Sequence, residues 1–179
     1  MGISYCGIAQ GHPFHGPFHD NEHGFPTRDD AVLFERLCLE INQAGLSWLT
    51  VLKKREAFWK AYYAFDIDRV ARFKKRDIDR LLGDASIIRN RRKIEAVIEN
   101  ARRLCTMRNT HGSFAGWLDS YHAQNLEEWI LIFRRTFVFT GKEIVNEFLM
   151  GTGYLPGAHD QDCPVYKLIL QANPPWTQT

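Results

Sequence analysis

Residues 77–107 read DIDRLLGDASIIRNRRKIEAVIENARRLCTM, and this stretch decides the fold. Its first part, Asp77 to Leu82, has the pattern of a short helix that stops at Gly83. A turn follows through Ile88, and a long helix is predicted from about Arg89 to Met107. Apolar residues recur in that helix at the period of one buried face, namely at Ile94, Val97, Ile98, Ala101 and Leu104. The stretch therefore predicts two helices joined by a tight turn.

Helical signals also dominate the rest of the chain. Capping residues predict where several helices begin: Thr27 or Asp29 for a helix to about Ala44, Ser47 for the next helix through Trp59, and Asp66 for a short helix through Phe73. Later helices are expected near 114–122, 126–135 and 141–150, and Pro164 fits the first turn of a last helix through Leu170. Residues 1–28, rich in glycine, proline and histidine, are expected to be irregular. With no alternating pattern of strand length, the predicted fold is all-α.

The composition fits a globular protein. The chain has 179 residues, of which 45% are hydrophobic and 25% are charged, which is enough for one domain or two small lobes that share a core. It has no apolar run of the roughly 18 residues that a membrane helix needs. Its first ten residues lack the pattern of a secretory signal. We therefore expect a cytoplasmic protein without a membrane partner, in which the cysteines stay reduced.

Positive charge is concentrated in one segment. Between Arg69 and Arg103 there are twelve basic and five acidic residues, an excess of seven positive charges, whereas the whole chain has a net charge of +2. The long helix opens with four of the basic residues, at a place where backbone N–H groups are free to bind phosphate: Arg89, Arg91, Arg92 and Lys93. The ordinary alternative is a solvated basic face on a helical hairpin. The clustering at the helix start favours an anionic partner such as nucleic acid.

Glu40 lies where an apolar face is expected. It follows Leu37 by three residues, so it lies at the edge of the buried arc of its helix and loses solvation there. From the pattern alone, the favoured interpretation is a boundary residue that reaches solvent or pairs with an arginine. The alternative is an acid in a ligand pocket. Trp48, which follows closely, is either a core residue or an aromatic wall for a cationic ring beside Glu40.

Two pairs of cysteine and histidine lie near opposite ends of the chain, Cys6 with His19 and His159 with Cys163. Two thiolates and two imidazoles are the ligands of one kind of closed tetrahedral Zn²⁺ site. His159 and Cys163 are four residues apart, so one turn of helix would place both on the same face. The loop between Cys6 and His19 matches no ordinary zinc finger. Spacing alone leaves open whether the four residues bind together or are unrelated.

A set of further motifs occurs in a fixed order along the chain. They are Cys6-Gly7; His19-Asp20-Asn21-Glu22 with Gly24 and Pro26; Leu33-Phe34-Glu35 with Leu39-Glu40; Gln43 to Trp48 continuing to Arg55; Ile87-Ile88-Arg89 with Arg91, Lys93-Ile94 and Asn100-Ala101; and His159-x₃-Cys163. In this order they resemble the 3-methyladenine DNA glycosylases of the Tag type. The likeness is strong over residues 6–105, weak over 106–150, and returns at the last pair.

The resemblance implies a helix–hairpin–helix glycosylase fold with one structural Zn²⁺ per chain. The implied zinc ligands are Cys6, His19, His159 and Cys163. The implied lobes are a helix–hairpin–helix lobe of residues 29–114 and a terminal lobe of residues 1–28 and 115–179, with a base pocket at their junction. The implied activity is base excision repair by a monomeric hydrolase, acting on double-stranded DNA that contains alkylated bases.

The same resemblance assigns roles to single residues. Glu40 is the implied catalytic residue and reads the base by hydrogen bonding, while Trp48 and Phe18 stack on it. Leu46 fills the gap that the flipped nucleotide leaves in the duplex. The implied DNA contacts continue at Gly83, Ser86, Arg89 and Arg91. Methylation at N3 makes adenine a cationic and good leaving group, so the family needs no activating aspartate, and water attacks the sugar carbon.

The chain departs from the family pattern at five positions, one of which is Phe18, where the family usually has a tyrosine. Ile8, His15 and His23 stand where the family has aromatic residues, and Ser86 stands where its hairpin has glycine. These changes leave the lesion specificity open, and they make His15 and His23 alternative metal ligands. Two other functions stay open as well: a DNA-damage-binding relative with lost or altered excision, and a zinc-stapled helical interaction module.

Overall fold

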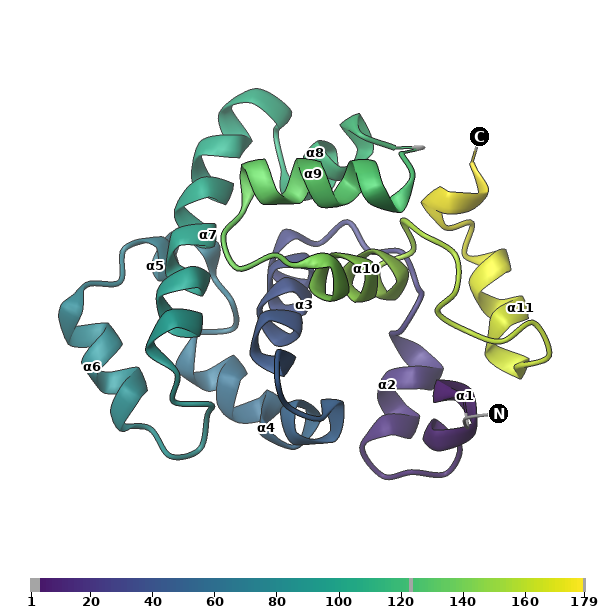
Figure 1. Ribbon diagram of the computed structural model, residues 1–179, viewed down its shortest axis with the longest axis horizontal. Coiled ribbons are helices and arrows are strands. Elements are labelled where there is room, and N and C mark those ends of the chain that lie inside the picture. The colour runs from purple at the N-terminus through teal and green to yellow at the C-terminus, as the bar shows by residue number, and fades with distance from the viewer. Residues whose placement is uncertain (1–3, 123, 179) are drawn as a thin grey trace.

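The computed structural model describes residues 4–122 and 124–178, and these residues form helices and no β-strand, as predicted (Figure 1). The helices are α1 (Tyr5–Ala9), α2 (His15–Asn21), α3 (Asp30–Gln43), α4 (Trp48–Ala61), α5 (Ile67–Ala71), α6 (Lys75–Gly83), α7 (Arg91–His111), α8 (Phe114–Ser120), α9 (Leu126–Thr136), α10 (Lys142–Gly151), α11 (Pro164–Gln171) and a short 3₁₀ helix, η1 (Pro175–Thr177). None of them is long and apolar enough to cross a membrane.

The predicted capping residues begin the helices that they were expected to begin. Asp29, Ser47 and Asp66 each accept hydrogen bonds from backbone N–H groups in the first turns of α3, α4 and α5. Pro164 occupies the first position of α11. Gly45 has a φ of 79° just beyond the end of α3, a conformation that glycine adopts without steric cost. These local signals therefore fix the ends of the central helices.

Two predictions about helix position were wrong. Residues 1–28 are not irregular, because they contain α1 and α2. Pro17 lies in the first turn of α2, where the missing N–H has no helical acceptor to lose. The long helix α7 begins at Arg91, with Asn90 as its N-cap, and not at Arg89. A high glycine and proline content thus concealed short helices at the start of the chain.

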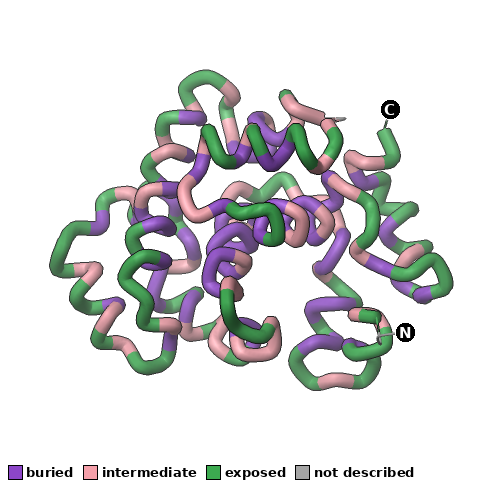
Figure 2. Tube along the Cα trace, viewed as in Figure 1, coloured by how far each residue is buried: buried purple, intermediate pink, exposed green. Residues whose placement is uncertain are grey.

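Helix α3 lies at the centre of the molecule, packed against α4, α7, α8 and α10. Figure 2 shows that it is buried along most of its length. Leu33, Phe34, Leu37 and Ile41 have no exposed surface. Because neighbours enclose this helix on several sides, the side chains near its C-terminal end have a fixed position relative to α4 and α10.

The two ends of the described chain lie on the same side of the molecule. Helices α1 and α2 at the start of the chain and the loop before α11 near its end approach one another there (Figure 1). A small apolar cluster forms beside this junction, made of Cys163, Val165 and Ile169. The division of the chain into lobes of residues 29–114 and of residues 1–28 with 115–179 stays a prediction.

Helices α6 and α7 pack against each other and are joined by residues 84–90. Asp84 closes the turn, because its carboxylate accepts the backbone N–H of Ser86 at 2.9 Å. Lys54 of α4 donates to the carbonyl oxygens of Ala85 and Ser86, at 3.3 and 2.9 Å. The turn is therefore held both by its own residues and by α4.

Candidate functional site

A pocket of about 540 Å³ opens between the end of α3, the loop that follows it, and α10. It is lined by Glu40, Gln43, Ala44, Gly45, Leu46, Gly141, Lys142, Glu143, Ile144 and Glu147. Leu46 is 43% exposed, so an apolar side chain stands at the rim. The structure thus brings two predicted site residues, Glu40 and Leu46, to one cavity.

Glu40 lies in the last turn of α3, with its carboxyl group enclosed. The pKa of Glu40 is raised to about 8, first by burial and second by the charge of Glu147, while the charge of Arg36 opposes this shift. No hydrogen bond to a described residue stabilises the carboxylate. The pairing with arginine that the boundary interpretation allowed is therefore absent from the described residues, and the carboxyl group is available to a ligand.

Phe18 and Trp48 are in contact with each other. The ring of buried Phe18, on α2, contacts half-buried Trp48, on α4, edge to face with centroids 5.1 Å apart. Trp48 also packs against the main core. Neither ring lines the cavity at Glu40. The structure thus brings the two predicted aromatic residues together, but not into the lining of this cavity.

Tyr5 is an aromatic residue that the sequence analysis missed. Its ring contacts those of His15 and His23 edge to face, with centroids 5.6 and 5.3 Å apart, and its hydroxyl lies 3.3 Å from His15 Nδ1. Burial raises the pKa of Tyr5, hydrogen bonding with Trp48 opposes this, and the charge of Glu40 adds to it. Tyr5 therefore lies beside two of the histidines that replace family aromatic residues. Recognition of α1 as a helix is the signal that would have pointed to it.

A network of charged residues supports the aromatic pair. The Arg36 guanidinium lies 4.7 Å from the centre of the Phe18 ring and donates to Glu22 at 2.7 Å. Arg55 of α4 donates to Glu22 and Glu35 at 2.7–3.0 Å. Burial alone would raise the pKa of Glu22, but hydrogen bonds from Arg55 and the charges of both arginines hold it below its usual value. The network joins the end of α2 to α3 and α4, and so fixes Phe18.

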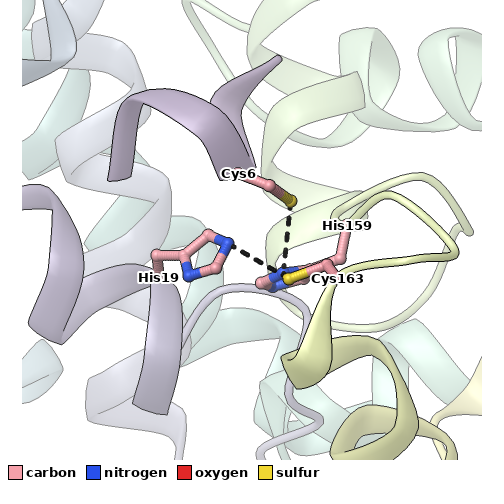
Figure 3. A group of neighbouring side chains, drawn as sticks. All are labelled: Cys6, His19, His159 and Cys163. Atoms are coloured by element: carbon pink, nitrogen blue, oxygen red, sulfur yellow. Dashed lines mark hydrogen bonds between the residues drawn. The ribbon is translucent and has the colours of Figure 1, made fainter. Parts of the chain in front are cut away.

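Cys6, His19, His159 and Cys163 converge, with their ligand atoms all within 4.8 Å of one another (Figure 3). Cys6 comes from α1 and His19 from α2. The prediction that a helical turn aligns the other two was wrong, because residues 159–163 form a loop and Cys163 is the N-cap of α11. A turn closed by the Cys163 N–H and the Asp160 carbonyl, at 3.0 Å, brings them together instead.

The distances within this cluster fit a tetrahedral metal site. The sulfur-to-nitrogen distances are 3.7 Å for Cys6 and His159 Nδ1, 3.7 Å for Cys163 and His19 Nε2, and 3.5 Å for Cys163 and His159 Nδ1. Tetrahedral Zn²⁺ with ordinary bond lengths separates sulfur and nitrogen ligands by about 3.6 Å. The four residues can therefore hold a metal ion.

Hydrogen bonds outside the cluster set the orientation of its histidines. His19 Nδ1 lies 2.7 Å from an Asp20 carboxylate oxygen, and His159 Nε2 lies 2.8 Å from the His23 carbonyl oxygen. Such bonds leave the other ring nitrogen of each histidine unprotonated and directed at a metal. Among the described residues His15 and His23 do not belong to the cluster, so the alternative ligand set gains no support.

The predicted phosphate-binding residues surround the start of α7, where Arg89 and Arg91 are exposed. The turn has fewer N–H groups free to bind phosphate than the sequence predicted, because the N–H of Ser86 already donates a hydrogen bond to Asp84. Asn90 caps α7 by accepting the N–H of the third helical residue. The first two helical N–H groups, of Arg91 and its neighbour, have no acceptor within the helix. The end of α7 therefore has more free backbone N–H groups than the turn, and phosphate binding there stays a prediction.

Lys93 was expected to add to the exposed basic charge at this end of α7, and that prediction was wrong. Its side chain is buried, and Nζ donates to the carbonyl oxygens of Asn42 at 2.8 Å and Ala44 at 2.6 Å. These carbonyl groups lie at the end of α3, just before Leu46. Lys93 therefore links the start of α7 to the loop that forms the pocket rim.

Residues 8–130 match the methyladenine glycosylase family. The chain is 45% identical over 116 residues to DNA-3-methyladenine glycosylase 1 of Escherichia coli (strain K12), a match that covers 65% of this chain and 62% of that protein. It is 34% identical over 166 residues to the DNA-3-methyladenine glycosylase of Haemophilus influenzae, covering 82% of this chain and 89% of that protein. The match thus spans less than two thirds of the Escherichia coli relative and most of the other.

Solved structures of similar fold come from the same group of proteins. One is a tyrosine-to-phenylalanine variant of 3-methyladenine DNA glycosylase I in complex with 3-methyladenine, with a TM-score of 0.83, 32% identity, and coverage of 90% of this chain and 97% of that chain. Another is 3-methyladenine DNA glycosylase I from Staphylococcus aureus, described for its recognition of 3-methyladenine, with a TM-score of 0.82, 32% identity, and coverage of 92% and 97%.

Proposed function

The chain belongs to the methyladenine glycosylase family, and we propose that it is a DNA glycosylase that excises 3-methyladenine from alkylated DNA. One observation carries the proposal: the enclosed carboxyl group of Glu40 has no partner among the described residues and borders a cavity that Leu46 also lines. The names of the relatives and the complex of a similar protein with 3-methyladenine support the same activity.

Glu40 reads the flipped base in this proposal. Its pKa of about 8 leaves the carboxyl group largely protonated near pH 7, so it can donate as well as accept a hydrogen bond. A cationic base favours the ionised form, so binding of such a base lowers the pKa of Glu40. In this proposal the base extends beyond the cavity that Glu40 lines and reaches Trp48 and Phe18, and the network behind Phe18 keeps its ring in place.

DNA contacts position the lesion over this pocket. Leu46, exposed at the rim, occupies the gap left by the flipped nucleotide. The N-terminal end of α7 binds a phosphate through backbone N–H groups, and Arg89 and Arg91 add attraction that depends on salt. Gly83 and Ser86 bring the turn close to the strand. Together α6, the turn and α7 form the proposed helix–hairpin–helix element.

The chemistry then asks little of the protein. The bond between the sugar C1′ and the base N9 breaks, and its electron pair moves onto N9, which neutralises the cationic base. Water attacks C1′ and loses a proton to solvent. Removal of the Glu40 contact leaves a polar edge of the base unpaired, at a cost of about 1–3 kcal/mol.

We further propose that the four-residue cluster holds one structural Zn²⁺. Two thiolates and two imidazoles fill all four positions of a tetrahedral ion, so no position is left for a reacting water. The ligands come from α1, α2 and the loop before α11, so they fasten the helix that carries Phe18. The monomeric state and the cytoplasmic location stay predictions.

Release of 3-methyladenine from methylated duplex DNA tests the activity directly. We expect release by the wild type, strongly reduced release by Glu40→Gln, and normal release by Glu56→Gln, which removes an exposed carboxylate on α4. A wild type that binds the methylated duplex in a salt-dependent way and releases no base would refute the enzyme and favour the damage-binding relative. Affinity for duplex that does not fall with added salt contradicts both DNA functions.

A further inference from the structure

Glu147 is a second acid at the cavity that Glu40 lines. It lies on α10, which also contributes the exposed Glu143, and Glu40 lies on α3, so two helices that are far apart in sequence and packed against each other bring three carboxyl groups to the cavity. Glu147 is half-buried and forms no ion pair with a described residue. Lys142, the cation that lines the same cavity, is exposed.

The two carboxyl groups influence each other. The charge of Glu147 is the second largest cause, after burial, of the raised pKa of Glu40. Burial and then the charge of Glu143 raise the pKa of Glu147 itself. Other charged or titratable groups near Glu40 are Arg36 on its own helix, Tyr5 on α1, and Lys142 and Glu143 on α10, which line the same cavity. When a cation binds between two carboxylates that share an enclosed site, it offsets the repulsion between their negative charges.

We propose that Glu147 is a specificity-determining residue that, together with Glu40, selects a positively charged methylated base over uncharged bases. This inference rests on the proposed function. It goes beyond that function because no residue of α10 belongs to the sequence motifs or to the predicted site. A base methylated at N3 within DNA carries a positive charge, and the normal bases carry none. Charge is therefore a property by which a pocket lined by three acids, of which Glu40 and Glu147 are partly buried, can discriminate.

The proposal has a kinetic consequence. The base is cationic until the glycosidic bond breaks, and the electron pair that moves onto N9 then makes it neutral. The attraction to Glu147 acts on the bound substrate and is absent from the neutral product. Loss of this attraction should therefore raise KM and leave kcat unchanged or slightly higher.

Two small probes separate charge from shape. The 3,9-dimethyladeninium ion has a fixed positive charge, with a methyl group on N9 in place of the sugar, and free 3-methyladenine at pH 8 is uncharged. Quenching of tryptophan fluorescence reports binding of each. We expect Glu147→Gln to weaken binding of the charged probe about tenfold, because one charge is lost at short range in a partly enclosed site. Binding of the uncharged probe should change by less than about twofold.

Two further variants control the experiment. Glu127→Gln removes an exposed carboxylate on α9, away from the cavity, and should leave both affinities unchanged. Glu147→Asp keeps the charge and should keep the preference for the charged probe, even where Glu147→Gln is poorly folded. Equal loss of both probes in Glu147→Gln, or an unchanged affinity for the charged probe, overturns the proposal. Base release by the wild type from methylated DNA, measured in parallel, shows separately whether the proposed function holds.

Discussion

The enclosed carboxyl group of Glu40 should make the folded protein less stable as the pH rises. Its pKa is about 8 in the folded chain, against 4.5 for an ordinary glutamate. Between these two values the folded state holds more protons than the unfolded state, so stability falls with rising pH. The full difference would be about 3 kcal/mol at pH 7, and since the side chain keeps some contact with solvent we expect about 2–3 kcal/mol.

The Glu40→Gln variant removes this ionisation while keeping the shape of the side chain. It should be more stable than the wild type by less than about 1 kcal/mol at pH 5 and by about 2–3 kcal/mol at pH 7 to 8. Urea denaturation of both proteins at pH 5, 7 and 8 measures the difference, and equal slopes against urea show that compactness is unchanged. A difference that stays constant with pH would refute the reasoning, because Glu40 would then ionise as easily when folded as when unfolded.

Three other perturbations test other parts of the molecule. Cys163→Ala should lower the zinc content from near one per chain to near zero, measured by elemental analysis after purification with added zinc; a folded wild type without metal contradicts the proposed site. Tyr5→Leu should weaken binding of free 3-methyladenine by about tenfold through loss of aromatic contact, as read by fluorescence titration, and unchanged affinity would mean that Tyr5 does not contact the base. Lys93→Met should destabilise the protein by about 1–3 kcal/mol, since it leaves buried carbonyl groups unsatisfied, and it should also lower base release. Chemical denaturation measures the stability, and a variant as stable as the wild type would mean that water replaces the ammonium group.

Local signals predicted most of the helical framework. Asp29, Ser47 and Asp66 cap the helices that they were expected to cap, because capping depends on a few neighbouring residues. The start of the chain was not predictable in this way. The glycines and prolines there are typical of loops, and the packing of α1 and α2 against the rest of the fold outweighs that preference.

The site, like the fold, could be predicted only in part from the sequence. The resemblance supplied Glu40, Leu46 and the four metal-binding candidates, which the structure places at one cavity and one cluster. Tyr5 and Glu147 were missed, because their importance comes from contacts between helices that are far apart in the sequence. The roles of the remaining site residues stay predictions until the variants are measured.

The cluster at the chain ends also sets an order of assembly during synthesis. A ribosome makes the chain from its N-terminus, so α1 and α2 are available long before Cys163, the last of the four ligands. The cluster cannot close until residue 163 has been made. The helices that carry Tyr5 and Phe18 therefore reach their proposed anchor last, and a chain interrupted before residue 163 would hold its central helices without the complete set of four ligands.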